Sequence, residues 1–250
     1  MSKNDKVKQP GCLHLKCKLL TVLNPNPKSA LLIGATGLIG SHCLRFLLES
    51  TCYEKVIVLT RRATQVNHPK LQEHIIDFDR LASFRHLIKA DDGFCCLGTT
   101  LKKAGSKENF RKVDFIYPLE TARILAENGA GQYLIVTAMG AHPSSLFFYN
   151  RVKGAAEEAI KQLPFSGIHI FRPSLLQGHR NELRLAEQTA NIVFKVLNPI
   201  FIGPLKRYRA IEGRVVARAM EAVACHRQPG IHVYESDQIQ DIYDKIPKTL

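Results

Sequence analysis

The stretch Ala30-Leu31-Leu32-Ile33-Gly34-Ala35-Thr36-Gly37-Leu38-Ile39-Gly40 decides the fold of this 250-residue chain. An apolar run leads into three glycines, and an apolar helical pattern follows them. In such a strand–turn–helix unit, the first glycine permits the tight turn. The second lets the backbone approach a phosphate, and the third lets the helix pack closely on the sheet. By itself, the same triplet also suits a glycine-rich turn in another kind of α/β protein.

The N-terminus of the helix after this turn is the expected anion site. Unpaired N–H groups and the helix dipole both attract negative charge there, and a pyrophosphate is the usual ligand. We therefore expect the turn to bind a dinucleotide through Gly34, Thr36, Gly37, Leu38, Ile39 and Gly40.

Strand-like and helix-like segments alternate along the body of the chain. The apolar and β-branched runs predict strands at 30–33, 55–60, 74–77, 93–97, 132–137 and 167–171. The segments between them predict helices at 38–49, 81–90, 115–128 and 153–162. This alternation predicts an α/β fold of the Rossmann type, a doubly wound parallel sheet with helices on both faces.

The two ends of the chain differ from this body. Residues 1–28 contain Pro10-Gly11 and two further prolines, and they predict a flexible basic arm; residues 29–250 then form a single domain. Near the C-terminus we expect a helix at 182–197, a helix at 212–225 and a strand at 231–234. We expect residues 175–212 to form a small substrate cap, with either a pocket wall or plain core made by Phe194, Leu197, Ile200, Phe201 and Ile202.

Charge and composition narrow the classes of function. The net charge is +13, of which the arm carries +5 and the remainder is spread widely, and no nucleic-acid-binding signature occurs. No apolar run is long enough to span a membrane, and Lys16 and Lys18 interrupt the only apolar run of the arm. The seven cysteines match no metal pattern. We therefore expect reduced thiols, no metal, no specific nucleic-acid partner and a cytoplasmic location.

Two arginines follow the second predicted strand. Sites for NAD usually carry Asp or Glu at this position to bind the ribose 2′-hydroxyl. Here the residues are Arg61 and Arg62, and a guanidinium can bind a 2′-phosphate that a carboxylate would repel. The position favours NADP(H) over NAD(H), although two arginines in a solvated loop are the ordinary alternative.

Further cofactor contacts are expected at the ends of later strands. Asp77 follows the third strand and either accepts a hydrogen bond from the adenine or is a solvated turn residue. Leu97, Gly98 and Thr99 follow the fourth strand, where the backbone passes close to a ribose. Pro173 follows the sixth strand and either turns the chain over the nicotinamide or only ends the strand.

Tyr149 and Lys153 form the candidate catalytic pair. Their spacing puts both on one face of a helix. A phenol with a pKa near 10 is a poor acid or base at neutral pH, but a neighbouring ammonium lowers that pKa. Tyr149 can then exchange a proton with a carbonyl or alcohol oxygen while hydride moves at the adjacent carbon.

Together these motifs resemble the short-chain dehydrogenase/reductase superfamily. More closely, they resemble the atypical subgroup typified by the HIV Tat-interactive oxidoreductase protein. The resemblance covers roughly residues 29–235 and rests on the glycine turn, Gly93–Thr100 with Lys103-Ala104-Gly105, Val113-Asp114, Tyr149-x-x-x-Lys153-Gly154 and Phe171-Arg172-Pro173. It implies a Rossmann-type domain, NADP(H) binding, and catalytic roles for Tyr149 and Lys153, with Lys153 also on the nicotinamide ribose.

The chain departs from the superfamily at the serine that normally binds the substrate oxygen. The run after the fifth strand is Val136-Thr137-Ala138-Met139-Gly140, so Thr137 is the expected hydroxyl, with Ser144 or Ser145 as weaker choices. If Ala138 occupies the true position, the triad is broken. For two nearby residues we expect a helix cap at Asp114 and, at Arg172, either a cofactor contact or an ion pair.

The sequence therefore predicts an NADP(H)-dependent oxidoreductase acting on a small-molecule carbonyl or alcohol. The alternative is an NADP(H)-binding sensor with weak or no turnover, motivated by Ala138. A third, weaker hypothesis is surface or nucleic-acid association through the basic arm. The substrate is not readable from the sequence, and assembly as a homodimer stays open.

Overall fold

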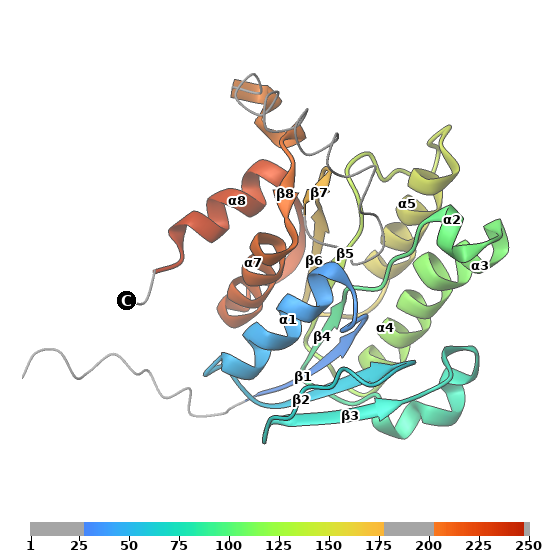
Figure 1. Cartoon of the computed structure of the whole chain (residues 1–250), viewed down its shortest axis with the longest axis vertical. Helices are drawn as coiled ribbons and strands as arrows, with labels where there is room; N and C mark the ends of the chain where they lie inside the picture. Colours follow the sequence, from blue (N-terminus) through green and yellow to red (C-terminus); the bar gives the residue numbers. More distant parts are fainter. Residues whose placement is uncertain (1–27, 178–202, 248–250) are drawn as a thin grey trace, which may run out of the picture.

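A computed structural model of the chain describes residues 28–177 and 203–247. One parallel seven-stranded sheet has the order β3-β2-β1-β4-β5-β6-β9 (Figure 1). Its strands are β1 (Lys28–Ile33), β2 (Tyr53–Thr60), β3 (Leu71–Ile75), β4 (Asp92–Cys95), β5 (Gln132–Val136), β6 (Gly167–Arg172) and β9 (Gly230–Glu235). The predicted Rossmann-type parallel sheet is confirmed.

Helices connect these strands and cover both faces of the sheet. They are α1 (Leu38–Glu49), α2 (Leu101–Ala104), α3 (Lys107–Arg111), α4 (Tyr117–Glu127), α5 (Phe148–Lys161), α7 (Gly213–His226) and α8 (Ser236–Lys245). Shorter helical segments are the 3₁₀ helices η1 (Phe78–Leu87) and η4 (Gly203–Tyr208) and the π-helical turn η2 (Lys112–Ile116). The helix expected at 182–197 and the five apolar residues from Phe194 to Ile202 lie outside the described residues.

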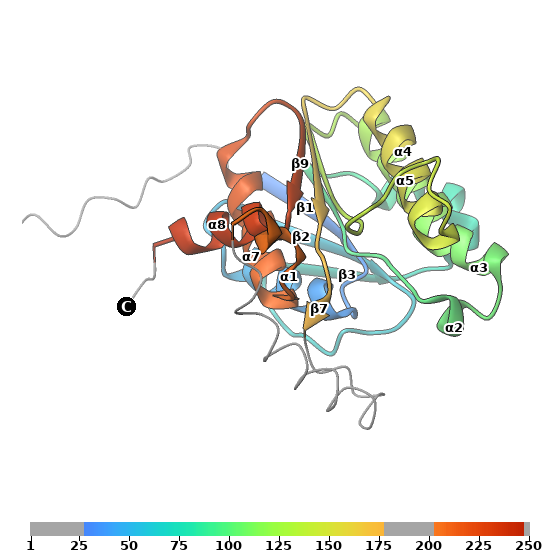
Figure 2. The ribbon, with the colours of Figure 1, turned by 90° about the horizontal axis from the view of Figure 1, so that it is seen from above.

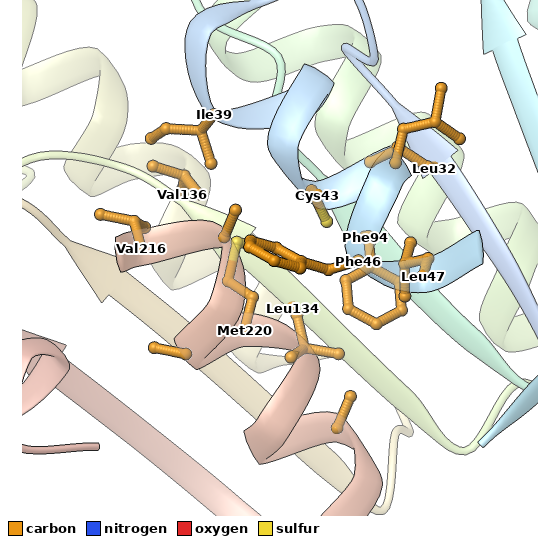
Figure 3. Close-up of a cluster of buried hydrophobic side chains, with 14 of the residues drawn as sticks. Leu32, Ile39, Cys43, Phe46, Leu47, Phe94, Leu134, Val136, Val216 and Met220 are labelled. Atoms are coloured by element: carbon orange, nitrogen blue, oxygen red, sulfur yellow. The ribbon is translucent and has the colours of Figure 1, made fainter. Parts of the chain in front are cut away.

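Alternation along the strands divides the core into two layers. Leu32 of β1 packs with α1 and α7 on one face, whereas Leu31 and Ile33 pack with η1, α4 and α5 on the other. Figure 2 shows the sheet between these two groups of helices. In Figure 3, Phe46 of α1 and Met220 of α7 meet over Phe94 of the sheet. Both faces of the sheet are therefore buried, as continuous apolar strands require.

Several element boundaries differ from the prediction. The expected helix at 81–90 is the 3₁₀ segment η1, which has a non-helical Arg80 and starts where Asp77 accepts the N–H of Asp79. The third strand lies at Leu71–Ile75, earlier than predicted, because it pairs with β2 along the sheet edge. The helix expected at 115–128 is reached through α3 and η2, and α5 starts at Phe148, five residues before the predicted start.

The helix expected at 212–225 is α7, and the strand expected at 231–234 is β9, which adds a seventh strand to the sheet. β9 pairs in parallel with β6, and α8 follows it through a capping box between Glu235 and Gln238. The small strands β7 (Leu176–Gln177) and β8 (Ile211–Glu212) pair with each other on either side of residues 178–202. No helix in the two described segments is long and apolar enough to cross a membrane.

A buried polar network ties the N-terminal edge of the sheet to α7. Asp92 accepts hydrogen bonds from Lys28 Nζ at 2.7 Å, from the Tyr53 hydroxyl at 2.8 Å and from Gln132 Nε2 at 3.0 Å. Lys28 Nζ and Gln132 Nε2 also donate to the carbonyl of Ala224 at 3.2 Å. Each oxygen of the buried carboxylate therefore has a donor, as an ion pair inside a protein requires.

Cys52 and Cys225 form a disulfide between the turn after α1 and the end of α7. The prediction of reduced thiols is wrong for this pair. The two residues are 173 positions apart, and only the packing of α7 against α1 brings them together. Among the described residues, Cys43, Cys95 and Cys96 are free thiols.

Candidate active site

The glycine turn has the backbone geometry that the sequence predicts. Gly34 has φ +84°, and a Cβ there would lie 2.5 Å from the backbone carbon of Cys96. A Cβ on Gly40 would lie 2.0 Å from the Gly34 carbonyl oxygen, so this glycine sets the close approach of α1 to the turn. A Cβ at either position would therefore displace the backbone.

The N-terminus of α1 is open to an anion. Gly37 is the N-cap residue, no side chain caps the helix, and its first turn contains no acidic residue. The helix N–H groups there lack the usual Ser, Thr or Asp partner. This end of α1 lies at the carboxyl edge of the sheet, beside the end of β4, which is where dinucleotides bind in open parallel sheets.

The carboxyl end of β2 is basic. Arg61 and Arg62 are both exposed immediately after β2, and the backbone of Arg62 is bonded in both directions to Thr60 Oγ1. Burial and a hydrogen bond to Asp79 raise the pKa of Tyr117 to about 12, while the charge of Arg61 opposes this rise. Arg61 therefore lies close to Tyr117. No carboxylate follows β2 directly, so nothing on this strand end would repel a 2′-phosphate.

The other residues expected to contact the cofactor differ in their exposure and in their hydrogen bonds. Asp77 is exposed and caps η1 by accepting the N–H of Asp79 at Oδ1. Gly98 is exposed, and Thr99 donates its N–H to Asp114 Oδ2 at 2.9 Å. Leu97 packs at the edge of the core layer under α4 and α5. These residues line the carboxyl ends of β3 and β4, as expected.

The centre of the site is a buried ion pair under a phenol ring. Lys153 Nζ lies 2.7 Å from Asp114 Oδ1 and 5.3 Å from the centroid of the Tyr149 ring. The side chains of Lys153 and Asp114 are only 6% and 0% exposed. Tyr149 itself is half-buried and packs against Phe110. The structure thus brings Tyr149 and Lys153 together on α5, and it adds Asp114, a carboxylate that the sequence reasoning did not place there.

Asp114 does not cap a helix, which corrects the expectation for that residue. It lies within the π-helical turn η2, and its side chain faces Lys153 and the loop after β4. Asp114 Oδ1 pairs with the Lys153 ammonium at 2.7 Å, and Oδ2 accepts the Thr99 N–H, so the carboxylate has a partner on each oxygen. A capping carboxylate would accept hydrogen bonds from the N–H groups of the first helical turn. Here the carboxylate holds the position of Lys153 instead.

The electrostatics of the site favour a charged lysine. Burial alone would lower the pKa of Lys153, but the charge of Asp114 and the neighbouring Tyr149 outweigh it, and the pKa is raised. A lysine that stays charged beside a phenol stabilises the phenolate. The pair is therefore suited to move a proton at the Tyr149 oxygen.

The structure does not place the Thr137 hydroxyl toward Tyr149. Thr137 is buried, and its Oγ1 donates to Glu157 Oε1 at 2.5 Å. Glu157 lies eight residues beyond Tyr149 on α5, about 12 Å along the helix axis. The Thr137 hydroxyl is therefore directed to Glu157, and its role in orienting a substrate oxygen stays a prediction.

Glu157 is the residue that sequence reasoning missed. Its carboxylate is fully buried, accepts the Thr137 hydroxyl and pairs with the Arg172 guanidinium. For Arg172 this resolves the open choice in favour of an ion pair. The only signal in the sequence was the spacing of Tyr149, Lys153 and Glu157, four residues apart on one helix face.

The segment between β5 and α5 contains Ala138 and the two serines Ser144 and Ser145. Ala138 follows Thr137, and the Met139 N–H donates to the carbonyl of Pro173 at 3.0 Å. Ser144 Oγ lies 2.7 Å from His142 Nδ1, and Ser145 Oγ accepts the N–H of Phe147. Each of these serines has a partner in the loop itself, so neither replaces the missing hydroxyl beside Tyr149 in this structure.

Comparison with known proteins places these features in a family. A model of the NAD dependent epimerase/dehydratase family matches residues 30–150. Protein HTATIP2 of Rattus norvegicus is 33% identical over 171 residues, covering 67% of this chain and 70% of that protein. The mitochondrial protein FMP52-1 of Scheffersomyces stipitis is 30% identical over 233 residues, covering 87% of this chain and 100% of that protein.

Solved structures with the same fold include two that contain NAD. MoeE5 in complex with UDP-glucuronic acid and NAD superposes with a TM-score of 0.63 and 16% identity, covering 82% of this chain and 75% of that one. The Bordetella bronchiseptica enzyme WbmH in complex with NAD⁺ gives a TM-score of 0.63 and 18% identity, covering 88% and 80%. At these identities the likeness shows the fold alone.

The relatives also correct the expected location. FMP52-1 and the FMP52 proteins of Aspergillus fumigatus and Candida albicans are named mitochondrial. The prediction of a cytoplasmic protein is therefore contradicted. It rested on the odd number of cysteines and the lack of a recognised export signal, and neither feature addresses a mitochondrial location.

Proposed function

This chain belongs to the NAD-dependent epimerase/dehydratase family, and we propose that it is an NADP(H)-dependent oxidoreductase that interconverts a small-molecule carbonyl and an alcohol. The observation that carries the proposal is the buried Lys153–Asp114 pair with Lys153 Nζ 5.3 Å from the Tyr149 ring centroid. The open helix end at Gly37 supplies the neighbouring anion site.

Each residue of the site has a distinct role in this proposal. A bound nicotinamide supplies or accepts the hydride at the substrate carbon. Tyr149 donates its hydroxyl proton to the carbonyl oxygen in reduction and takes it back from the alcohol in oxidation. Lys153 stabilises the phenolate and binds the nicotinamide ribose. Asp114 is a positioning residue, because it acts only by holding Lys153 charged and in place.

The remaining cofactor contacts follow the strand ends. The turn residues Gly34, Thr36, Gly37, Leu38, Ile39 and Gly40 would hold the pyrophosphate. Arg61 and Arg62 would bind the 2′-phosphate, and their exposure after β2 supports NADP(H) over NAD(H). Asp77, Leu97, Gly98, Thr99 and Pro173 would surround the adenosine and nicotinamide halves. Residues 175–212, flanked by the β7–β8 pair, would cap the substrate.

Turnover by a Tyr149 variant tests this function. The purified chain would be assayed with NADPH against a panel of carbonyl compounds and with NADP⁺ against alcohols. Tyr149→Phe removes the proton that the reaction needs, and we expect turnover to fall at least about 100-fold. Tyr243→Phe on α8 is the matched control and keeps full turnover. Equal turnover of wild type and Tyr149→Phe would reject the catalytic role.

A second candidate function is an NADP(H)-binding regulator with weak or no turnover. The hydrogen bond from Thr137 to Glu157 favours it, because the site then lacks a hydroxyl donor for the substrate oxygen beside Tyr149. Loss of such a donor costs on the order of 100-fold or more in rate. Tight NADPH binding by wild type, with no turnover on any member of the panel, would select this candidate.

The names of the FMP52 relatives support a mitochondrial location for this chain as well. Imaging of the full chain with a C-terminal fluorescent tag would check this. Coincidence with a mitochondrial marker is the expected result, and a diffuse signal that excludes mitochondria would contradict it.

A further inference from the structure

Two large apolar side chains stand out from the surface just before α5. Leu146 is 94% exposed and Phe147 is 74% exposed, and the two are adjacent in the sequence. They are the two most exposed of the large apolar side chains in the described segments. Isolated exposed apolar residues are common, but an adjacent pair with this exposure marks an interaction site.

This pair is held outward by a set of hydrogen bonds. The Phe147 N–H donates to Ser145 Oγ at 3.3 Å, and Arg151 Nη1 donates to the carbonyls of Ser145 at 2.8 Å and Leu146 at 3.3 Å. The Arg151 N–H also donates to the Phe147 carbonyl at 2.9 Å as the first turn of α5 forms. These bonds hold the backbone at the start of α5 in place, and the two side chains project from it into solvent.

The surroundings of the pair are basic. Lys107 Nζ and the Arg151 guanidinium lie 5.6 and 5.9 Å from the ring centroid of Phe148. The adjoining helices α2 and α3 add Lys102, Lys103 and Arg111, all exposed, against the single exposed carboxylate of Glu108. Figures 1 and 2 show α2 and α3 at the same end of the molecule as the start of α5. We call Leu146 and Phe147, with these five cations, the basic apolar tip.

We propose that the basic apolar tip docks the protein on an anionic lipid bilayer. Apolar side chains that enter the boundary between headgroups and acyl chains, ringed by Lys and Arg, are the pattern by which proteins bind such surfaces. The cations are attracted to anionic headgroups, and long lysine side chains can reach them while their stems stay apolar. The five cations outnumber the one carboxylate, so the tip should be attracted to a negatively charged surface. The apolar pair Leu146 and Phe147 requires that this surface also has an accessible hydrocarbon layer, as a bilayer does.

This docking places the proposed site next to the membrane. Phe147 is two residues before Tyr149, at the carboxyl edge of the sheet. If the proposed function also holds, its substrates would include apolar carbonyl compounds drawn from the bilayer. The docking itself rests on the tip alone and does not need catalysis.

Vesicle co-sedimentation of the full chain tests the proposal. Wild type would be mixed with phosphatidylcholine vesicles, with and without phosphatidylserine. We expect binding to the anionic vesicles that weakens as salt is added, and much weaker binding to the neutral ones. The double variant Leu146→Ser/Phe147→Ser should bind the anionic vesicles at least about tenfold more weakly. The variant Lys102→Glu/Lys107→Glu should lose the preference for anionic lipid.

The matched control removes two other exposed apolar side chains. Ile75→Ser/Ile231→Ser changes residues that are 63% and 52% exposed on the edge strands β3 and β9, and it should bind as wild type does. The proposal is overturned if wild type ignores anionic vesicles. It is equally overturned if the tip variant binds them as tightly as wild type, since binding would then come from another part of the chain. Sedimentation velocity covers one further case: a dimer that the tip variant abolishes, without any vesicle binding, would assign the tip to self-association.

Discussion

The described residues contain two buried Lys–Asp pairs with the same 2.7 Å separation, one at each end of the parallel strands. At the N-terminal ends, Lys28 and Asp92 are 5% and 0% exposed, and the carboxylate also accepts hydrogen bonds from Tyr53 and Gln132. At the carboxyl ends, Lys153 and Asp114 are equally buried. There, however, the Thr99 N–H is the one further donor to the carboxylate among the described residues, and the neighbouring Gly98 is exposed.

The difference separates a structural pair from a functional one. A buried charge pair needs further hydrogen bonds to offset its desolvation, and the Lys28–Asp92 pair has them. The Lys153–Asp114 pair has fewer such donors, and it lies at the end of the sheet where the open N-terminus of α1 offers an anion site. Fewer protein partners at this end leave room for a bound ligand. The distance between two charges therefore says little about their role, and the state of the surrounding donors says more.

Replacing each lysine by methionine should separate the two pairs most clearly. Lys28→Met leaves Asp92 buried without its cation, and we expect a loss of about 3–5 kcal/mol in the free energy of unfolding. Lys153→Met leaves Asp114 buried with the Thr99 N–H as its donor, so we expect a loss of the same order. Urea unfolding of both variants measures these losses.

Cofactor affinity should separate the two variants. Lys28→Met is distant from the glycine turn and should keep the affinity of wild type for NADPH, whereas Lys153→Met should weaken it. Equal NADPH affinity of the two variants, or weaker NADPH binding by the Lys28 variant alone, would show that the two pairs do not differ as argued.

A second test uses His169 of β6, whose ring stacks on His232 of the edge strand β9 with the centroids 5.2 Å apart. These two residues lie away from the proposed site. Burial, together with the charge of His232, lowers the pKa of His169 to about 4. The folded chain therefore favours neutral His169. Above pH 6.5 the imidazole is neutral in both the folded and the unfolded chain, and the stability it supports is fully present. As the pH falls from 6.5 toward 4, only the unfolded chain takes up the proton, and the free energy of unfolding falls by about 3 kcal/mol in all. His169→Gln should flatten this part of the profile of unfolding free energy against pH.

His86→Gln, at an exposed position on η1, provides the control and should leave the profile unchanged. The Tyr234 hydroxyl, 3.2 Å from His169 Nδ1, is the other ionisable group beside the stack, and it does not titrate in this range because burial raises its pKa. A pH profile identical in wild type and His169→Gln would contradict the buried neutral imidazole.

The smallest expected effect concerns selectivity at the carboxyl edge. Arg61→Ser/Arg62→Ser removes the guanidinium groups after β2, and we expect NADPH to bind about tenfold more weakly, or roughly 1.4 kcal/mol. NADH lacks the 2′-phosphate, so its affinity should stay the same. Lys55→Ser, at the other end of β2, is the control. Equal losses for both nucleotides would assign the arginines to general attraction of anions.

Local sequence was enough to predict the framework. The helix at 38–49 begins and ends where predicted, because the glycine turn fixes its start and the apolar periodicity continues to Glu49. Tyr149 and Lys153 were found for the same reason, since residues four apart on a helix share a face.

Contacts between distant segments were not predictable in this way. The bond of Thr137 to Glu157, the approach of Asp114 to Lys153 and the Cys52–Cys225 disulfide each depend on how two elements pack. Sequence allows many cysteine pairings, and it does not show that a buried carboxylate will take the hydroxyl that a substrate would need. The partner of Thr137 was not predicted because only its chemical type was used, and its role at the substrate oxygen stays a prediction.

Calorimetric titration of the full chain with NADPH and with NADH tests the central claim most directly, namely that the glycine turn and the two arginines form a site for the phosphorylated dinucleotide. We predict that NADPH binds with measurable heat and at least about tenfold more tightly than NADH. Absence of heat with both nucleotides would contradict the account.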